Sequence, residues 1–163
     1  MHVLRTRNLG HVTRQDDAHR LAAAFGALLL RSNRAHLYQA LIGSQEGLDE
    51  ATYPVLSGLA RMGSATATEL AEQIGLDRTV TTRHASRLEN AGLLVRRPHS
   101  TDARATSLEL SASGRRCIEE SRVRLDDLLL GTMQDWSAAR VTEFTDDFVV
   151  VAQRVMAAVL EPA

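Results

Sequence analysis

Apolar residues in the first third of the chain recur at helical spacing. Between about Asp17 and Ile42 they stand at positions 21, 25, 28, 29, 37, 41 and 42. This spacing predicts one long amphipathic helix, preceded by a polar arm that covers residues 1 to about 15.

A second helical pattern follows the polar segment "GSQEGLDE". Its apolar positions are Val55, Leu56, Leu59 and Met62. Asp49 and Thr52 are alternative N-caps for this helix, and Pro54 is tolerated only near a helix start because proline lacks a backbone N–H.

Two short helices joined by a tight turn are predicted next. Thr66 and Glu69 form a capping box, and this helix runs through Ile74 and stops at Gly75. Asp77 then caps a helix over residues 78–90, and Gly92 can take the left-handed conformation that ends it. The pair predicts a helix-turn-helix.

The pattern then changes from helical spacing to alternation. Leu93 to Arg97 and Ala105 to Leu110 alternate as two strands of a hairpin. Ser111 caps a long helix, and the final helix covers about residues 138–160. That last helix is apolar on more than one side, which predicts a partner surface. The expected fold is mainly α with a small β-hairpin: a winged helix-turn-helix core between long terminal helices.

Charge is distributed unevenly along a chain whose formal net charge is −1. Residues 78–104 hold six arginines and two acids, whereas residues 117–163 hold four arginines and nine acids. Such an uneven distribution of charge suits one face of the protein to a polyanion.

No apolar run reaches the ~20 residues of a membrane span and no secretion signal is evident, so we expect a cytoplasmic protein without a membrane partner.

In a winged helix the second helix of the helix-turn-helix enters the DNA major groove, and the hairpin loop reaches the adjacent backbone or minor groove. The segment "RRPHSTDARATSLEL" would be this wing. We expect Arg104 near its tip, where a narrow minor groove attracts a guanidinium group. Arg96, Arg97 and His99 would face phosphates, and Asp102 would shape the turn by bonding Arg104 or a loop amide.

The run "LAEQIGLDRTVTTRHASRLENAGLLVRRPHSTDARATSLELSASG" resembles the winged-helix core of MarR-type transcriptional regulators, and the likeness covers about residues 48–114. It implies a homodimer, triangular in outline, that reads a pseudo-palindromic site on double-stranded DNA, most simply a repressor released by a ligand. The implied organisation is an N-terminal arm and dimerisation helix (1–47), the DNA-binding core (48–111) and C-terminal dimerisation helices (112–163), all in one compact domain.

The resemblance also assigns site residues. The DNA-facing set would be Arg78, Thr79, Val80, Thr82, Arg83, Ser86, Arg87, Arg97, His99 and Arg104. Arg83 is the best candidate for a bidentate contact to guanine, and threonines suit phosphates or thymine methyls. Thr81 and His84 fall on the inward side and Val80 on the outward side.

MarR-type proteins commonly bind small anionic or phenolic molecules, so an effector site is implied as well. Its candidates, chosen by position, are His19, Arg20, Tyr53 and His84. The competing interpretation of His84 is an imidazole packed in the core with its hydrogen bonds satisfied.

Other interpretations are weaker. The arginine-rich helix could be a solvated surface helix, and a winged helix can also bind proteins without touching DNA. Cys117 is the only cysteine, so a buried structural thiol is favoured over a redox sensor. His2, His11 and His19 lack the spacing of a zinc site, and no cofactor is implied. No catalytic motif occurs in a suitable context, so an enzyme is not expected.

Overall fold

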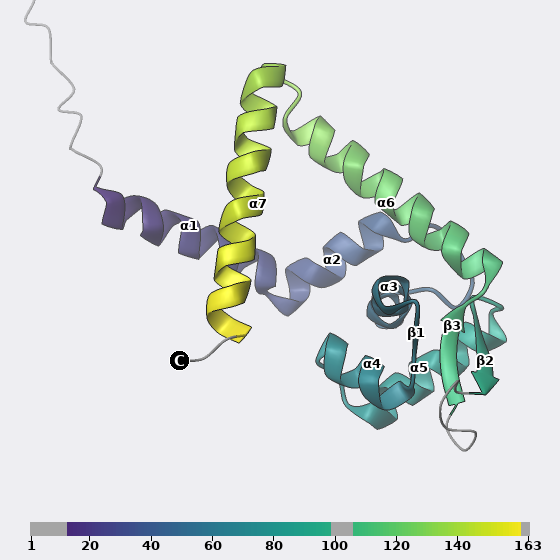
Figure 1. Ribbon diagram of the computed structural model, residues 1–163. Coiled ribbons are helices and arrows are strands. Elements are labelled where there is room, and N and C mark those ends of the chain that lie inside the picture. The colour runs from purple at the N-terminus through teal and green to yellow at the C-terminus, as the bar shows by residue number, and fades with distance from the viewer. Residues whose placement is uncertain (1–12, 99–105, 161–163) are drawn as a thin grey trace, which may run out of the picture. The chain divides into compact units, whose positions relative to one another are not determined.

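The computed structural model describes residues 13–98 and 106–160. Within them lie seven helices and three strands: α1 (Arg14–Leu29), α2 (Arg31–Leu41), α3 (Tyr53–Met62), β1 (Ser64–Ala65), α4 (Ala67–Ile74), α5 (Arg78–Asn90), β2 (Leu94–Pro98), β3 (Thr106–Leu110), α6 (Ala112–Thr132) and α7 (Ala138–Leu160) (Figure 1). The chain forms two compact units, one ending at Ser121 and one starting at Arg122. None of these helices combines the length and apolarity that a membrane crossing requires.

The prediction of a single helix from Asp17 to Ile42 is wrong, because the segment is broken between α1 and α2. Leu30 takes an extended conformation, with φ −56° and ψ 134°. The Asn33 side chain donates a hydrogen bond to the Ala27 carbonyl at 2.8 Å. An amide side chain that bonds a carbonyl at the end of a helix offers the backbone an alternative to continued helix.

The helix-turn-helix follows its predicted caps. Thr66 and Glu69 form a reciprocal capping box at the start of α4, and Gly75 ends that helix in the left-handed conformation, with φ +67°. Asp77 caps α5, and Gly92 follows the end of α5 with φ +71°. Of the two alternative N-caps predicted for α3, the structure places Thr52 at the N-cap position, without a side-chain cap hydrogen bond, and Pro54 lies in the first turn.

A three-stranded antiparallel sheet accompanies these helices, in the order β1-β3-β2. In the β2–β3 hairpin, Arg96 pairs with Leu108 and Pro98 pairs with Thr106. This hairpin was predicted from the alternating pattern, but β1, whose Ala65 pairs with Leu108 on the other side of β3, was not. A strand of two residues is too short to show an alternation of apolar and polar positions in the sequence.

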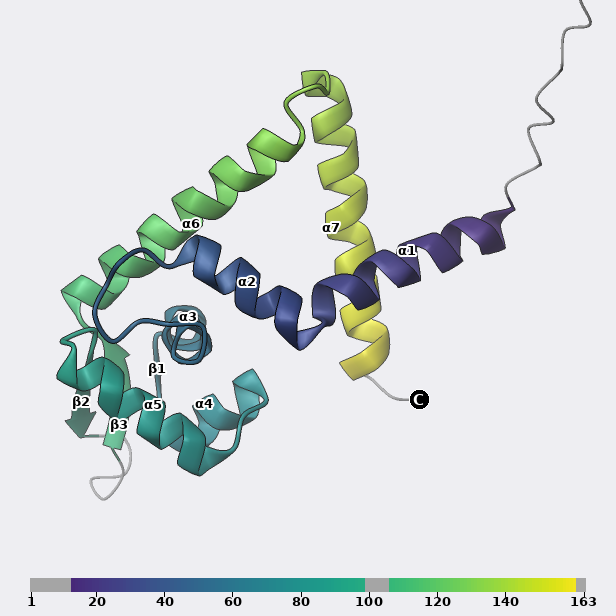
Figure 2. The ribbon, with the colours of Figure 1, turned by 180° about the vertical axis from the view of Figure 1, so that it is seen from behind.

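One core joins the sheet to α3, α4, α5 and the start of α6, which Figures 1 and 2 show around the strands. Its fully buried side chains include Val55, Leu56, Leu59, Leu70, Leu88, Leu93, Leu94 and Leu108. Cys117 is buried at its edge, as expected for a structural thiol. This core fixes the position of α5.

The second unit contains the C-terminal part of α6 together with α7. No residue of α7 is buried. Trp136 meets Phe144 edge to face at 5.3 Å, and Arg140 lies 4.1 Å from the centre of the indole ring. The apolar residues of α7 therefore remain largely exposed in a single chain.

Candidate nucleic-acid interface

The N-terminus of α5 is held by one carboxylate. Asp77 Oδ1 accepts hydrogen bonds from the backbone N–H groups of Thr79 at 2.7 Å and Val80 at 3.2 Å. These bonds, that of Val80 first, hold the pKa of Asp77 below its usual value. The cap therefore stays charged at neutral pH and sets where the helix begins.

One face of α5 packs into the core. Thr81, Ala85 and Leu88 are fully buried and His84 is nearly so. The Thr81 hydroxyl donates to the Asp77 carbonyl at 3.0 Å. The predicted inward position of Thr81 and His84 is confirmed, although both are polar.

The opposite face is exposed and carries four of the predicted DNA-facing residues, which are Arg78, Thr79, Thr82 and Arg83. Val80, expected to point outward, is half-buried. The Thr82 hydroxyl donates to the Arg78 carbonyl at 2.9 Å. Its methyl group and oxygen lone pairs remain available for a thymine methyl or a donor.

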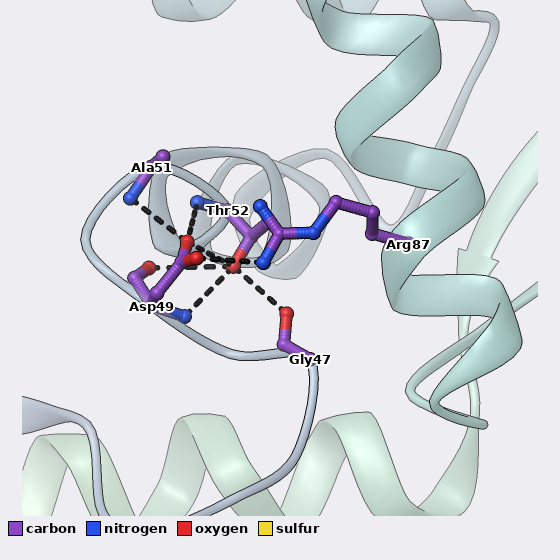
Figure 3. Close-up of polar contacts among 5 residues, drawn as sticks. All are labelled: Gly47, Asp49, Ala51, Thr52 and Arg87. Carbon is purple, nitrogen blue, oxygen red and sulfur yellow. Dashed lines mark hydrogen bonds and ion pairs between the residues drawn. The ribbon is translucent and has the colours of Figure 1, made fainter.

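The C-terminal half of α5 differs from expectation because its polar groups bond to the protein. Arg87 Nη2 forms an ion pair with Asp49 Oδ2 at 2.7 Å (Figure 3). Arg96, on β2, donates from Nε to Glu89 at 2.8 Å and from Nη2 to Ser86 Oγ at 3.1 Å. Arg96 thus ties the hairpin to α5, whereas we expected it to face phosphates.

The hairpin brings one further predicted cation to the surface. Arg97 is exposed on β2, opposite Ser107 of β3. The remaining predicted wing residues, His99, Asp102 and Arg104, lie outside the described residues. Arg78, Arg83 and Arg97 are the arginines of this region that form no ion pair within the described part of the chain.

His84 has an unusual environment for an ionisable group. Its Nδ1 is buried without a hydrogen-bond partner among the described residues. Burial first, and then the charges of Arg83 and Arg87, lower the pKa of His84, while Asp49 opposes the shift. The shift favours the neutral imidazole at pH 7. The buried position of His84 agrees with the core interpretation, but that interpretation requires a satisfied Nδ1, and no described residue bonds this atom.

The other effector candidates lie in different surroundings. His19 and Arg20 are exposed on α1, where Arg20 pairs with Asp17 at 3.1 Å. Tyr53 is half-buried at the start of α3, with its ring 5.0 Å from that of Tyr38. The four candidates thus divide between an exposed helix and the edge of the core.

Sequence reasoning missed Asp49 and Glu89 as partners of the interface arginines. Asp49 precedes Arg87 by 38 residues, so no helical or strand periodicity links them. Glu89 is seven residues from Arg96 but across the turn between α5 and β2.

A helix-turn-helix followed by a two-stranded wing, with arginines and threonines on the outer face of the second helix, defines a winged helix of the DNA-binding class. The model of the MarR family matches residues 46–105. A curated relative, the uncharacterized HTH-type transcriptional regulator YwhA of Bacillus subtilis (strain 168), is 27% identical over 127 residues, which are 72% of this chain and 91% of the relative.

Solved structures show the same fold. The crystal structure of a MarR family transcription regulator has a TM-score of 0.68 at 23% identity, covering 93% of this chain and 99% of the other. The PcaV transcriptional regulator of Streptomyces coelicolor, in complex with its natural ligand, has a TM-score of 0.51 at 22% identity, covering 94% and 98%. Over its winged-helix core, this chain is therefore similar to MarR family transcriptional regulators.

Proposed function

We propose that this regulator is a homodimer that binds a pseudo-palindromic operator through two copies of α5. The observation that carries the proposal is the outer face of α5, where two arginines and two threonines are exposed beside a capped N-terminus. Arg83 would read guanine, and Arg78 and Arg97 would contact phosphates. Thr79, Val80, Thr82 and Ser86 complete the proposed surface, together with His99 and Arg104 of the wing, whereas Arg87 is paired with Asp49.

Dimerisation would cover the exposed apolar residues of the terminal helices. On α7 they include Phe144, Phe148, Val149, Val150, Val155, Met156, Val159 and Leu160. Exposed apolar surface of this extent marks an interaction site, and two-fold symmetry matches two half-sites of an operator. We assign residues 1–47 and 112–163 to dimerisation and residues 48–111 to DNA binding.

A matched pair of variants tests the dimer. Val155→Glu places a charge on the apolar side of α7, and we expect it to give monomers in analytical ultracentrifugation. Gln153→Glu places the same charge two residues away, on a different side of the helix, and should leave the dimer intact. A Val155→Glu protein that remains dimeric would contradict this interface.

DNA binding is tested by fluorescence anisotropy with the intergenic DNA upstream of the protein's own gene, against a scrambled duplex, over a series of salt concentrations. We expect preference for the native duplex and an affinity that falls steeply with salt. Weak binding that ignores sequence at every salt concentration would favour the second candidate, a winged helix that binds a protein. The neutralisation of Arg87 and Arg96 by Asp49 and Glu89 is the observation in its favour.

The proposed mode of action is repression relieved by a small anionic or phenolic molecule. The PcaV structure, which holds a natural ligand, supports a ligand-responsive fold. A ligand that prefers a conformer with displaced α5 helices would weaken operator binding in proportion to that preference. His19, Arg20, Tyr53 and His84 are the residues to substitute once a ligand is found by screening in the same anisotropy assay.

A further inference from the structure

The turn before α3, residues 47–52, is attached to the C-terminal half of α5. The carboxylate of Asp49 bonds both the backbone of this turn and a side chain of α5. Asp49 Oδ1 accepts hydrogen bonds from the backbone N–H of Ala51 at 3.1 Å and of Thr52 at 2.9 Å. Asp49 Oδ2 binds Arg87 Nη2 at 2.7 Å (Figure 3). The same side chain therefore shapes the turn and holds α5.

The turn itself is rigidly constructed. Thr52 is fully buried, and its hydroxyl donates to the Gly47 carbonyl at 3.0 Å and accepts from the Asp49 N–H at 2.9 Å. Burial alone would raise the pKa of Asp49, but hydrogen bonds to its carboxylate, first from Arg87 and then from Thr52, hold that pKa below its usual value. Asp49 is thus an anion at neutral pH.

Backbone packing provides a second attachment. Gly47 has φ +77°, and a Cβ at this position would lie 2.5 Å from Ala91 Cβ and 3.4 Å from the Arg87 carbonyl oxygen. The turn therefore lies directly against the last turn of α5. A glycine is required there by both conformation and space.

These contacts remove Arg87 from the set of free cations. Its guanidinium is directed at Asp49, while Arg78 and Arg83, on the first two turns of the same helix, form no ion pair among the described residues. The helix thus has a half with free cations, suited to reading DNA, and a half anchored to the protein. A small rotation of the anchored half would displace the groups of the other half, because a helix moves as a rigid element.

We propose that Asp49 is a positioning residue for the recognition helix, which holds Arg87 against the protein so that Arg83 is presented to DNA at the correct tilt. Arg87 acts through this anchor rather than through a phosphate. The proposal rests on the proposed function, namely that α5 reads an operator. It assigns a role in base discrimination to a loop residue outside the helix-turn-helix.

The test compares Asp49→Asn with Glu50→Gln. Asparagine keeps an oxygen for the Ala51 and Thr52 amides but loses the charge that binds Arg87. Glu50→Gln removes one negative charge from an exposed position of the same turn without touching Arg87, so it controls for net charge. Each variant is titrated with the upstream duplex and the scrambled duplex over the salt series.

We expect Asp49→Asn to weaken binding to the native duplex about fivefold, the upper range for loss of an exposed ion pair, with unchanged affinity for scrambled DNA and an unchanged salt slope. Arg87→Gln should give the same loss, and the double variant no further loss, because both substitutions break one contact. Glu50→Gln should not weaken binding. Tighter binding by Asp49→Asn with a steeper salt slope would overturn the proposal, since it would show that Asp49 only masks a phosphate-binding Arg87.

A measurement on the free protein separates this proposal from the function on which it rests. We expect the amides of residues 87–91 to exchange hydrogen faster in Asp49→Asn than in the wild type or in Glu50→Gln. Equal exchange rates in all three proteins would overturn the anchor, whatever the DNA result. If the wild type prefers no duplex, the proposed function fails, and the exchange comparison still decides whether Asp49 anchors α5.

Discussion

The packing of α6 against the hairpin can be tested with one methyl group at Gly114. The first turn of α6 is bonded to the start of the hairpin: Ser111 Oγ donates to the Gly92 carbonyl at 2.6 Å and accepts from the Gly114 N–H at 3.0 Å. The Ser111 N–H also donates to the Leu93 carbonyl at 3.1 Å. A Cβ at Gly114 would overlap the Leu93 carbonyl oxygen and lie 3.0 Å from its carbon.

The expected cost of Gly114→Ala follows from this geometry. Overpacking costs about 1–3 kcal/mol, and the upper end applies because a backbone carbonyl cannot rotate away as a side chain can. Alanine is better than glycine in a helix by about 1 kcal/mol, which offsets part of the cost. We therefore expect the free energy of unfolding to fall by about 2 kcal/mol and Tm to fall by about 4–8 °C.

Gly131, near the other end of α6, is the matched control, because a Cβ there would meet no described atom within 4 Å. Gly131→Ala should be neutral or stabilise the protein by up to about 1 kcal/mol. Urea unfolding followed by circular dichroism, at constant m-value, measures both variants. A Gly114→Ala protein as stable as the wild type would show that α6 does not begin against Leu93, and the reasoning would fail.

Three further predictions concern the interface. Arg83→Ala should relax discrimination at one base pair per half-site by about 1–3 kcal/mol; an unchanged preference on a panel of mutated operators would show that the base contact is misassigned. Arg104→Ala, outside the described residues, should weaken all duplexes alike and flatten the salt slope, so a loss confined to certain sequences would contradict its backbone or minor-groove role. Because burial, and next the charges of Arg83 and Arg87, lower the pKa of His84, the unfolded chain binds the proton more readily than the folded one. The free energy of unfolding should therefore fall as pH drops below 6.5, the ordinary pKa of the residue. Urea titrations at pH 7.5 and 5.5 measure this loss, which His84→Leu should reduce. An equal loss of stability in both proteins would assign the effect to other groups.

The elements that sequence alone predicted are those defined by local chemistry. The Thr66 and Glu69 capping box, the Asp77 cap and the left-handed Gly75 each involve groups within a few residues, so their geometry follows from residue type and spacing. The order of helix, helix and hairpin followed from these signals. The inward position of Thr81 and His84 also followed, because helical periodicity assigns faces whatever the polarity of the side chain.

Tertiary structure alone decided which charged groups remain free. The pairing of Arg87 with Asp49, the bonds of Arg96 to Glu89 and Ser86, and the addition of β1 beside β3 join residues that no local period relates. Such contacts exist because the core brings separate segments together, and their free energy depends on distances that only the folded chain defines. Sequence therefore identified the helix that we propose reads DNA, whereas the fold determined which of its arginines form ion pairs with the protein.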